Sequence, residues 1–145
     1  MAELNTASAV ISFAHEVEED GAAVYENLAQ RFPEHKELFL SFAAENRKNI
    51  KNVERAYYSV ITDALEGCFS FKVDSSKYDF EKATKLKSTF KDEMQHALDM
   101  EEKTVAFYTA AVEQSKGLIA DVSRAFTLVA RKRAERVEKL KGIVG

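Results

Sequence analysis

One stretch of residues occurs twice in this chain, and this repeat constrains the fold more than any other feature. Residues 14–25 and 97–108 place the same residue types in the same order, with Glu101 lying 83 residues after Glu18. Each glutamate is followed seven residues later by a tyrosine, Tyr25 in the first copy and Tyr108 in the second. Seven residues make two turns of an α-helix, so each acid shares a helix face with its tyrosine.

The rest of that face is apolar in both copies. Its members are Ala14, Val17, Ala22 and Leu28 in the first, and Ala97, Met100, Val105 and Ala111 in the second. A carboxylate within such a stripe is costly to bury without a partner. Glu18 and Glu101 are therefore the first candidates for a functional site.

Apolar residues at three-and-four spacing predict four helices, at about residues 6–31, 36–65, 79–117 and 118–141. Thr6 or Ser8 can cap the first helix, Pro33 ends it, Asp79 can cap the third, and Gly142 is the expected stop of the fourth. Residues 66–78 break the helical period and predict a long crossover that contains a short extended piece. The expected fold is all-α: two antiparallel helical hairpins, at about 6–65 and 79–142, in one domain over 1–145.

Composition agrees with this expectation. The chain has 145 residues, of which 46% are apolar and 31% charged, with one proline and no tryptophan. These values are typical of one soluble, mostly helical domain. The single cysteine, Cys68, allows no internal disulfide or cysteine-based metal site, which favours a reducing, cytoplasmic location.

Charge and hydropathy argue against two classes of partner. The net charge is only −3, so no strong field attracts nucleic acid. The basic residues 131–133, 136, 139 and 141 are interleaved with glutamates, and we interpret them mainly as a solvated helix face. No apolar stretch is long enough for a membrane span, and the N-terminus has no signal-peptide pattern, so we expect neither membrane nor secretion.

With these residues in place, the chain resembles the ferritin-like superfamily, and the rubrerythrin-like proteins within it, over essentially its whole length. The resemblance implies a four-helix bundle with two metal ions between the hairpins. In such proteins each hairpin supplies a glutamate from its first helix and a Glu-x-x-His pair from its second. Glu18 and Glu101 match the first-helix positions, and Tyr25 and Tyr108 stand beside them.

The second-helix positions depart from the family pattern. The matching residues are Asn46 and Asn49 in one hairpin and Lys132 and Glu135 in the other. Both imidazoles are absent, and a cation replaces a bridging carboxylate. We interpret this as a degenerate di-iron site, in which an inward Lys132 would supply positive charge among Glu18, Glu101 and Glu135.

One interpretation of Glu18 and Glu101 is that they are ordinary surface acids, but the matched apolar flanks and the repeat favour two other hypotheses. The first is a polar network, in which amides at 46 and 49 donate to the carboxylates and both tyrosine hydroxyls bond to them. The second is a reduced metal site built from Glu18, Glu101 and Glu135, with His15 or His96 drawn in.

The functional expectation divides in the same way. The first hypothesis predicts a non-enzymatic structural or partner-binding module without cofactor. The alternative is an oxidoreductase that uses di-iron, mononuclear iron or another divalent metal to handle peroxide or dioxygen, as the resemblance implies. Bundles of this size often pair with a copy of themselves, so we expect a homodimer, and the sequence identifies no other protein partner.

Overall fold

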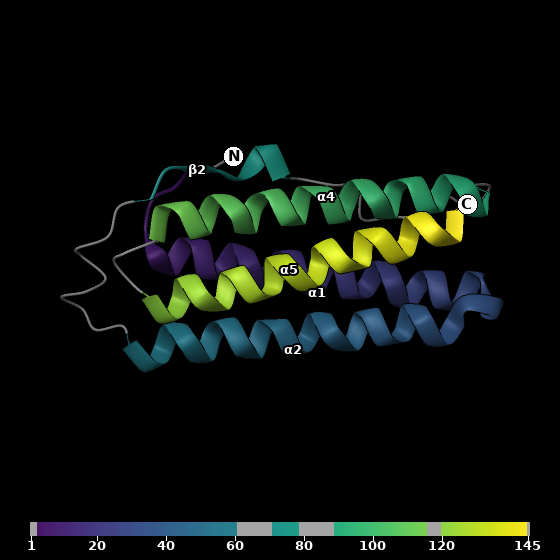
Figure 1. Cartoon of the computed structure of the whole chain (residues 1–145), viewed down its shortest axis with the longest axis horizontal. Coiled ribbons are helices and arrows are strands. Elements are labelled where there is room, and N and C mark those ends of the chain that lie inside the picture. Colours follow the sequence, from purple (N-terminus) through teal and green to yellow (C-terminus); the bar gives the residue numbers. More distant parts are fainter. Residues whose placement is uncertain (1–2, 61–70, 79–88, 116–119, 145) are drawn as a thin grey trace.

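The computed structural model describes residues 3–60, 71–78, 89–115 and 120–144. Four long helices dominate it (Figure 1): α1 (Ala7–Arg31), α2 (Lys36–Val60), α4 (Phe90–Ser115) and α5 (Ala120–Val144). The predicted all-α class is confirmed, with four long helices among the described residues. No helix among the described residues combines the length and apolarity that a bilayer span requires.

Local chemistry sets the first hairpin. The Thr6 hydroxyl accepts a hydrogen bond from Ala9 N at 3.0 Å and caps α1, as predicted. Pro33 opens a short 3₁₀ turn, Pro33–His35, that leads directly into α2. This short connection makes α1 and α2 antiparallel neighbours.

Helix α4 begins at Phe90, later than the predicted third helix. Thr89 lies outside any helix and forms a reciprocal cap with Asp92: Asp92 N donates to Thr89 Oγ1, and Thr89 N donates to Asp92 Oδ2. A continuous helix from Asp79 is therefore wrong, because this cap starts α4 at Phe90. Parts of the predicted helices and of the crossover lie outside the described residues, at 61–70, 79–88 and 116–119. Cys68 falls in the first of these ranges.

The end of the second hairpin also differs from prediction. Gly142 does not stop the last helix, which continues to Val144. Ile143 packs against the apolar core beyond that glycine, which favours another helical turn. A glycine weakens a helix by about 1 kcal/mol, too little to end it against such packing.

The helices run in an up-down-down-up order. Figure 1 shows α1 and α5 running in one direction and α2 and α4 in the other, so the connection from Val60 to Phe90 joins opposite ends of the bundle. The tightest packing lies within each hairpin, while α2 also packs on α5 and α1 approaches α4.

The described part of the crossover lies against α4. Strand β2 (Val73–Asp74) pairs antiparallel with β1 (Glu3–Leu4) near the N-terminus, and a 3₁₀ turn, Ser75–Tyr78, follows. The Gln114 side chain bonds both backbone groups of Lys72: its Oε1 accepts from Lys72 N at 2.6 Å and its Nε2 donates to Lys72 O at 2.9 Å. This amide clasp joins the crossover to α4.

Two separate apolar clusters make up the core. The first cluster lies toward the strands and includes Val10, Tyr57, Phe107 and Phe126. The second cluster lies toward the Pro33 turn and includes Leu28, Phe39, Met94 and Leu140. The candidate site lies between them.

Candidate functional site

Both repeated glutamates lie in the centre of the bundle. Glu18 on α1 and Glu101 on α4 are each 0% exposed. Their neighbours in the layer between the two apolar clusters are also buried and polar: Asn46, Asn49, Thr104, Arg133 and Arg136. We call these seven residues the polar layer.

The tyrosines bond the glutamates in a crossed arrangement. Tyr25 on α1 donates to Glu101 Oε2 on α4 at 2.5 Å, and Tyr108 on α4 donates to Glu18 Oε2 on α1 at 2.8 Å. The repeat places each acid and its own tyrosine on one helix face, yet each hydroxyl bonds the acid of the other hairpin. Two buried hydrogen bonds therefore join α1 to α4, which have few other close contacts.

Helix α2 contributes two amides. Asn46 Nδ2 donates to the backbone carbonyl of Glu18 at 3.0 Å, and Asn49 Nδ2 donates to Glu18 Oε1 at 3.4 Å. Both amides are 0% exposed. Glu18 is thus held by a phenol from α4 and an amide from α2.

Helix α5 contributes the positive charge, but from arginines rather than from the predicted lysine. Arg133 Nη1 and Arg136 Nη1 each lie 3.2 Å from Glu101 Oε2, and they donate to Asn46 Oδ1 at 2.7 and 2.6 Å. Arg133 Nε also lies 3.8 Å from Glu18 Oε2. One guanidinium therefore lies between the two glutamates, and a second shares Glu101 with it.

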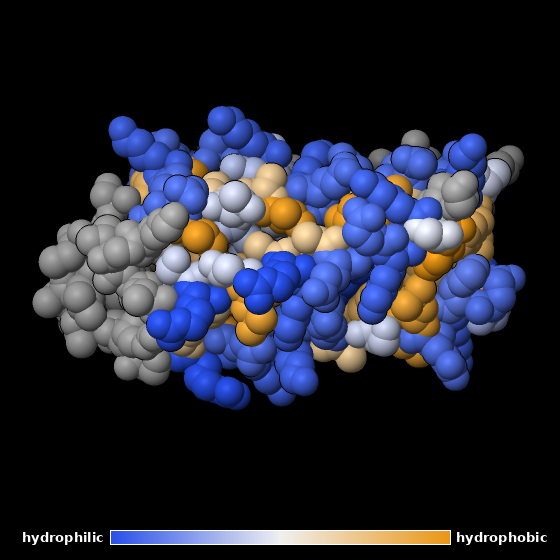
Figure 2. Space-filling model, viewed as in Figure 1, coloured by the Kyte–Doolittle hydropathy of each residue, from blue (hydrophilic) through white to orange (hydrophobic). Residues whose placement is uncertain are grey.

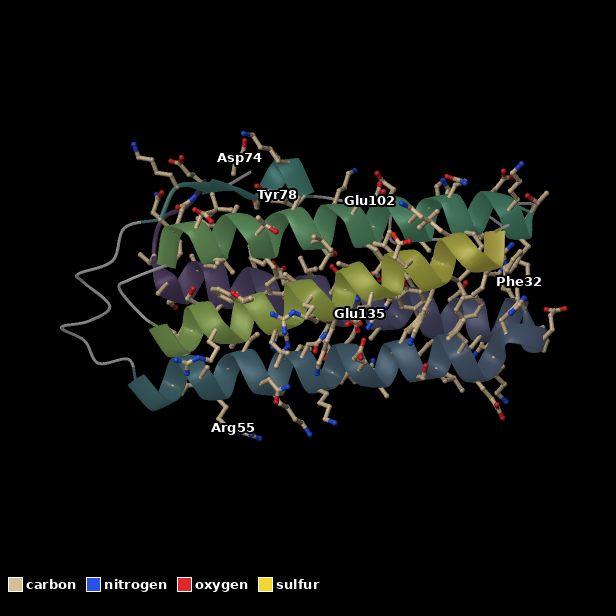
Figure 3. All side chains as sticks on the ribbon, in the orientation of Figure 1. Phe32, Arg55, Asp74, Tyr78, Glu102 and Glu135 are labelled. Carbon is tan, nitrogen blue, oxygen red and sulfur yellow. The ribbon has the colours of Figure 1, made fainter. Side chains whose placement is uncertain are left out.

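The expectation that Lys132 points inward beside Glu135 is wrong. Lys132 is half-buried, and Glu135, labelled in Figure 3, is exposed. Both line a surface hollow of about 130 Å³ between α2 and α5. Reading the basic run as a solvated face is wrong as well for Arg133 and Arg136, which are at most 1% exposed.

The alignment of the two second helices in the sequence is wrong by one residue, which explains why it points to Lys132 rather than to Arg133. Aligning Asn46 with Lys132 assumes an offset of 86 residues between the second helices, whereas the buried positions repeat at 87. At this offset Asn46 corresponds to Arg133 and Asn49 to Arg136. The apolar residues give the same signal in the sequence: Phe39 with Phe126, Phe42 with Val129, Ile50 with Val137 and Val53 with Leu140.

Two aromatic rings and a glycine shape the space around Arg133 and Arg136. The Arg136 guanidinium lies 4.6 Å from the Phe42 ring centroid and 5.4 Å from that of Tyr25, within cation–π range. Its Nη2 also reaches the half-buried Glu45 at 2.5 Å. Gly21 leaves room for the layer, because a Cβ there would lie 2.7 Å from Asn46 Nδ2.

Burial and charge set the protonation states. Burial raises the pKa of Glu18, although Arg133 and the Tyr108 hydroxyl oppose this. Burial and the carboxylates also raise the pKa of Tyr25 and of Tyr108, so both phenols stay protonated and donate. Burial lowers the pKa of Arg133, but Glu101 and Glu18 outweigh burial and raise it overall, so the guanidinium stays charged.

Four buried polar atoms have no protein hydrogen-bond partner within the described residues: Asn49 Oδ1, Glu101 Oε1, Arg133 Nε and Arg136 Nε. Each such atom costs about 1–3 kcal/mol if it stays unpaired. Together they would consume a large part of the stability of a domain of this size, commonly about 5–15 kcal/mol.

The residues present do not fit the di-iron centre that the resemblance implies. At the six corresponding positions the chain offers two carboxylates, two amides and two guanidiniums, and a guanidinium has no lone pair to give a metal. Among the described residues there is no group of three or more His, Cys, Asp or Glu side chains placed to hold a metal.

Neither candidate histidine joins the glutamates. His15 pairs with Glu54 at 2.9 Å on an exposed part of the first hairpin, and His96 lies 4.0 Å from Glu93. The reduced metal site built from Glu18, Glu101 and Glu135 is not assembled, since Glu135 is exposed.

Comparison with protein-family models, with curated proteins and with solved structures gives no significant match to this chain. Function must therefore be argued from the polar layer itself.

Proposed function

We propose that this chain is a ferritin-like bundle in which a protein network takes the place of the metal centre. The proposed role is non-enzymatic: a structural or partner-binding module that needs no cofactor. The fold order supports the assignment, because two antiparallel hairpins joined by an end-to-end crossover are typical of the superfamily.

The position of the two buried arginines carries the proposal. They lie three residues apart on α5, and Asn46 and Asn49 have the same spacing on α2. This is the Glu-x-x-His spacing of the family pattern, at the depth where the second-helix ligands would meet Glu18 and Glu101. All four second-helix ligand positions therefore carry side chains that donate hydrogen bonds.

Charge explains how such a layer can replace metal ions. Two buried carboxylates need positive charge nearby. In a di-iron protein the metals supply it, whereas Arg133 and Arg136 supply it here at 3.2–3.8 Å from the carboxylate oxygens. A divalent cation entering this layer would meet two guanidiniums that cannot be deprotonated.

The test is metal loading of the whole chain. Protein purified from iron-supplemented cells is analysed for metals, then loaded with Fe(II) without oxygen and exposed to air. We expect no stoichiometric iron and no near-ultraviolet absorbance from ferric carboxylate. Two tightly held irons per chain, with that absorbance, would refute the proposal and establish the iron oxidoreductase alternative.

A matched variant makes the negative result interpretable. The fourfold change Asn46→Glu, Asn49→His, Arg133→Glu and Arg136→His restores the family ligands at the observed register. We expect it to gain iron and the absorbance. The control variant carries Asn46→Glu, Asn49→His, Lys132→Glu and Glu135→His and keeps Arg133 and Arg136. We expect this control to gain neither iron nor the absorbance.

The expected partner is a second copy of the chain. The face seen in Figure 2 is mainly hydrophilic, with apolar side chains in the gaps. Large exposed apolar residues on the helices include Leu40, Tyr58 and Leu128. Light scattering after size exclusion tests this part: a mass of twice 16.3 kDa is expected, and a mass of 16.3 kDa over the concentration range would refute the homodimer.

A further inference from the structure

We propose that two internal water molecules complete the polar layer, each bridging one buried donor to one buried acceptor. The four unpaired atoms of the described layer are two N–H donors, Arg133 Nε and Arg136 Nε, and two oxygen acceptors, Asn49 Oδ1 and Glu101 Oε1. A water molecule both donates and accepts, so one water can satisfy one atom of each kind. Two waters satisfy all four.

The first donor and acceptor flank Glu18. Arg133 Nε lies 3.8 Å from Glu18 Oε2, which is too long for a direct hydrogen bond, and the Asn49 amide lies 3.4 Å from Glu18 Oε1. A water beside this carboxylate accepts from Arg133 Nε and donates to Asn49 Oδ1. Its second hydrogen is directed to Glu18, which gives it three partners, the usual number for a buried water.

The second donor and acceptor flank Glu101. Both guanidiniums and the Tyr25 hydroxyl converge on Oε2 of this carboxylate, and Oε1 has no partner among the described residues. Arg136 reaches Glu101 through Nη1 and leaves its Nε–H unpaired. A water that accepts from Arg136 Nε and donates to Glu101 Oε1 satisfies both.

The charges of the layer select a neutral ligand. A cation would face Arg133 and Arg136, while an anion would face Glu18 and Glu101. Unpaired donors and acceptors are equal in number, as a neutral molecule with both functions requires. This inference rests on the geometry of the layer and does not depend on the proposed biological role.

A crystal structure of the whole chain, at a resolution that orders water, is the direct test. We expect two full-occupancy waters, each at about 2.7–3.2 Å from its donor and acceptor. A dry layer in which the four atoms find protein partners would overturn the water inference and leave the proposed function intact. Density with anomalous scattering and short metal–oxygen distances would overturn both.

A measurement in solution tests the same waters without a crystal. Oxygen-17 magnetic relaxation counts internal waters that exchange slowly. Asn49→Leu removes the acceptor beside Glu18, and we expect it to lose one such water relative to the wild type. Lys48→Ala, one residue earlier and exposed, is the matched control and should lose none. An unchanged count in Asn49→Leu would overturn the inference for the Glu18 water.

Discussion

Replacing Glu101 by glutamine should destabilise the fold more than any other single-atom change in the polar layer. The substitution keeps the side-chain volume but removes the charge that two guanidiniums share, each at 3.2 Å. At an effective dielectric constant of about 20, each contact is worth roughly 5 kcal/mol before desolvation. Because desolvation offsets much of this attraction, the observed cost of breaking such a buried pair is about 3–5 kcal/mol.

Urea unfolding followed by circular dichroism gives the measurement. With a slope of about 2 kcal/mol per molar, the loss corresponds to a midpoint lower by roughly 1.5–2.5 M. Glu102→Gln is the matched control, since it makes the same change one residue later at an exposed position, and it should stay within about 0.5 kcal/mol of the wild type.

A loss below about 1 kcal/mol for Glu101→Gln would refute the reasoning, because that is the range of a surface ion pair. A fivefold apolar variant separates charge from packing: Glu18→Met, Glu101→Met, Arg133→Met, Arg136→Met and Asn46→Leu together remove every buried charge of the polar layer. It should recover most of the stability that Glu101→Gln loses, since apolar replacements of whole buried ion sets are often neutral or stabilising.

Further predictions concern packing, pH and the crossover. Gly21→Ala should lower the free energy of unfolding despite the better helix propensity of alanine, because the new Cβ would lie 2.7 Å from an amide nitrogen. Gly142→Ala, with open space around it, should raise the free energy of unfolding by up to about 1 kcal/mol. Thermal unfolding measures both changes. The raised pKa of Glu18 means that the folded state binds its proton more tightly than the unfolded state. The stability that this proton binding contributes is present below the ordinary pKa of 4.5 and is lost as the pH rises above it. Glu18→Gln has no such proton to bind, so its free energy of unfolding should compare more favourably with that of the wild type at neutral pH than near pH 4.5. A difference in urea unfolding that does not change with pH would contradict this. Gln114→Ala should increase amide hydrogen exchange at Lys72 and leave exchange in the α2 core unchanged, and equal exchange at Lys72 would argue against the clasp.

The sequence was sufficient to predict the all-α class and the ends of the first two helices near the Pro33 turn and the N-terminus because their signals are local. The Thr6 cap and Pro33 act within a few residues, and the repeated acid-to-tyrosine spacing assigns both to one helix face. Thr89 was missed because the apolar pattern continues through its position, although Thr89 and Asp92 have the spacing of a reciprocal cap.

The partners within the layer could not be predicted in the same way. A helix face identifies which side chains point inward but not which helix supplies the partner, so the crossed bonds of Tyr25 and Tyr108 appear only in three dimensions. The arginines were missed for a different reason. Their charge suggests solvent, and only the apolar register of α2 against α5 places Arg133 and Arg136 inside.

The sharing of Glu101 Oε2 among Tyr25, Arg133 and Arg136 also bears on how this sequence can change over generations. Loss of the acid removes the carboxylate that both cations share, and loss of either cation leaves the acid with less compensation, so single-substitution intermediates are expected to be less stable than either endpoint. Substitutions here should accumulate as coordinated sets. Natural variants of this chain are expected to keep all of these residues or to exchange several together.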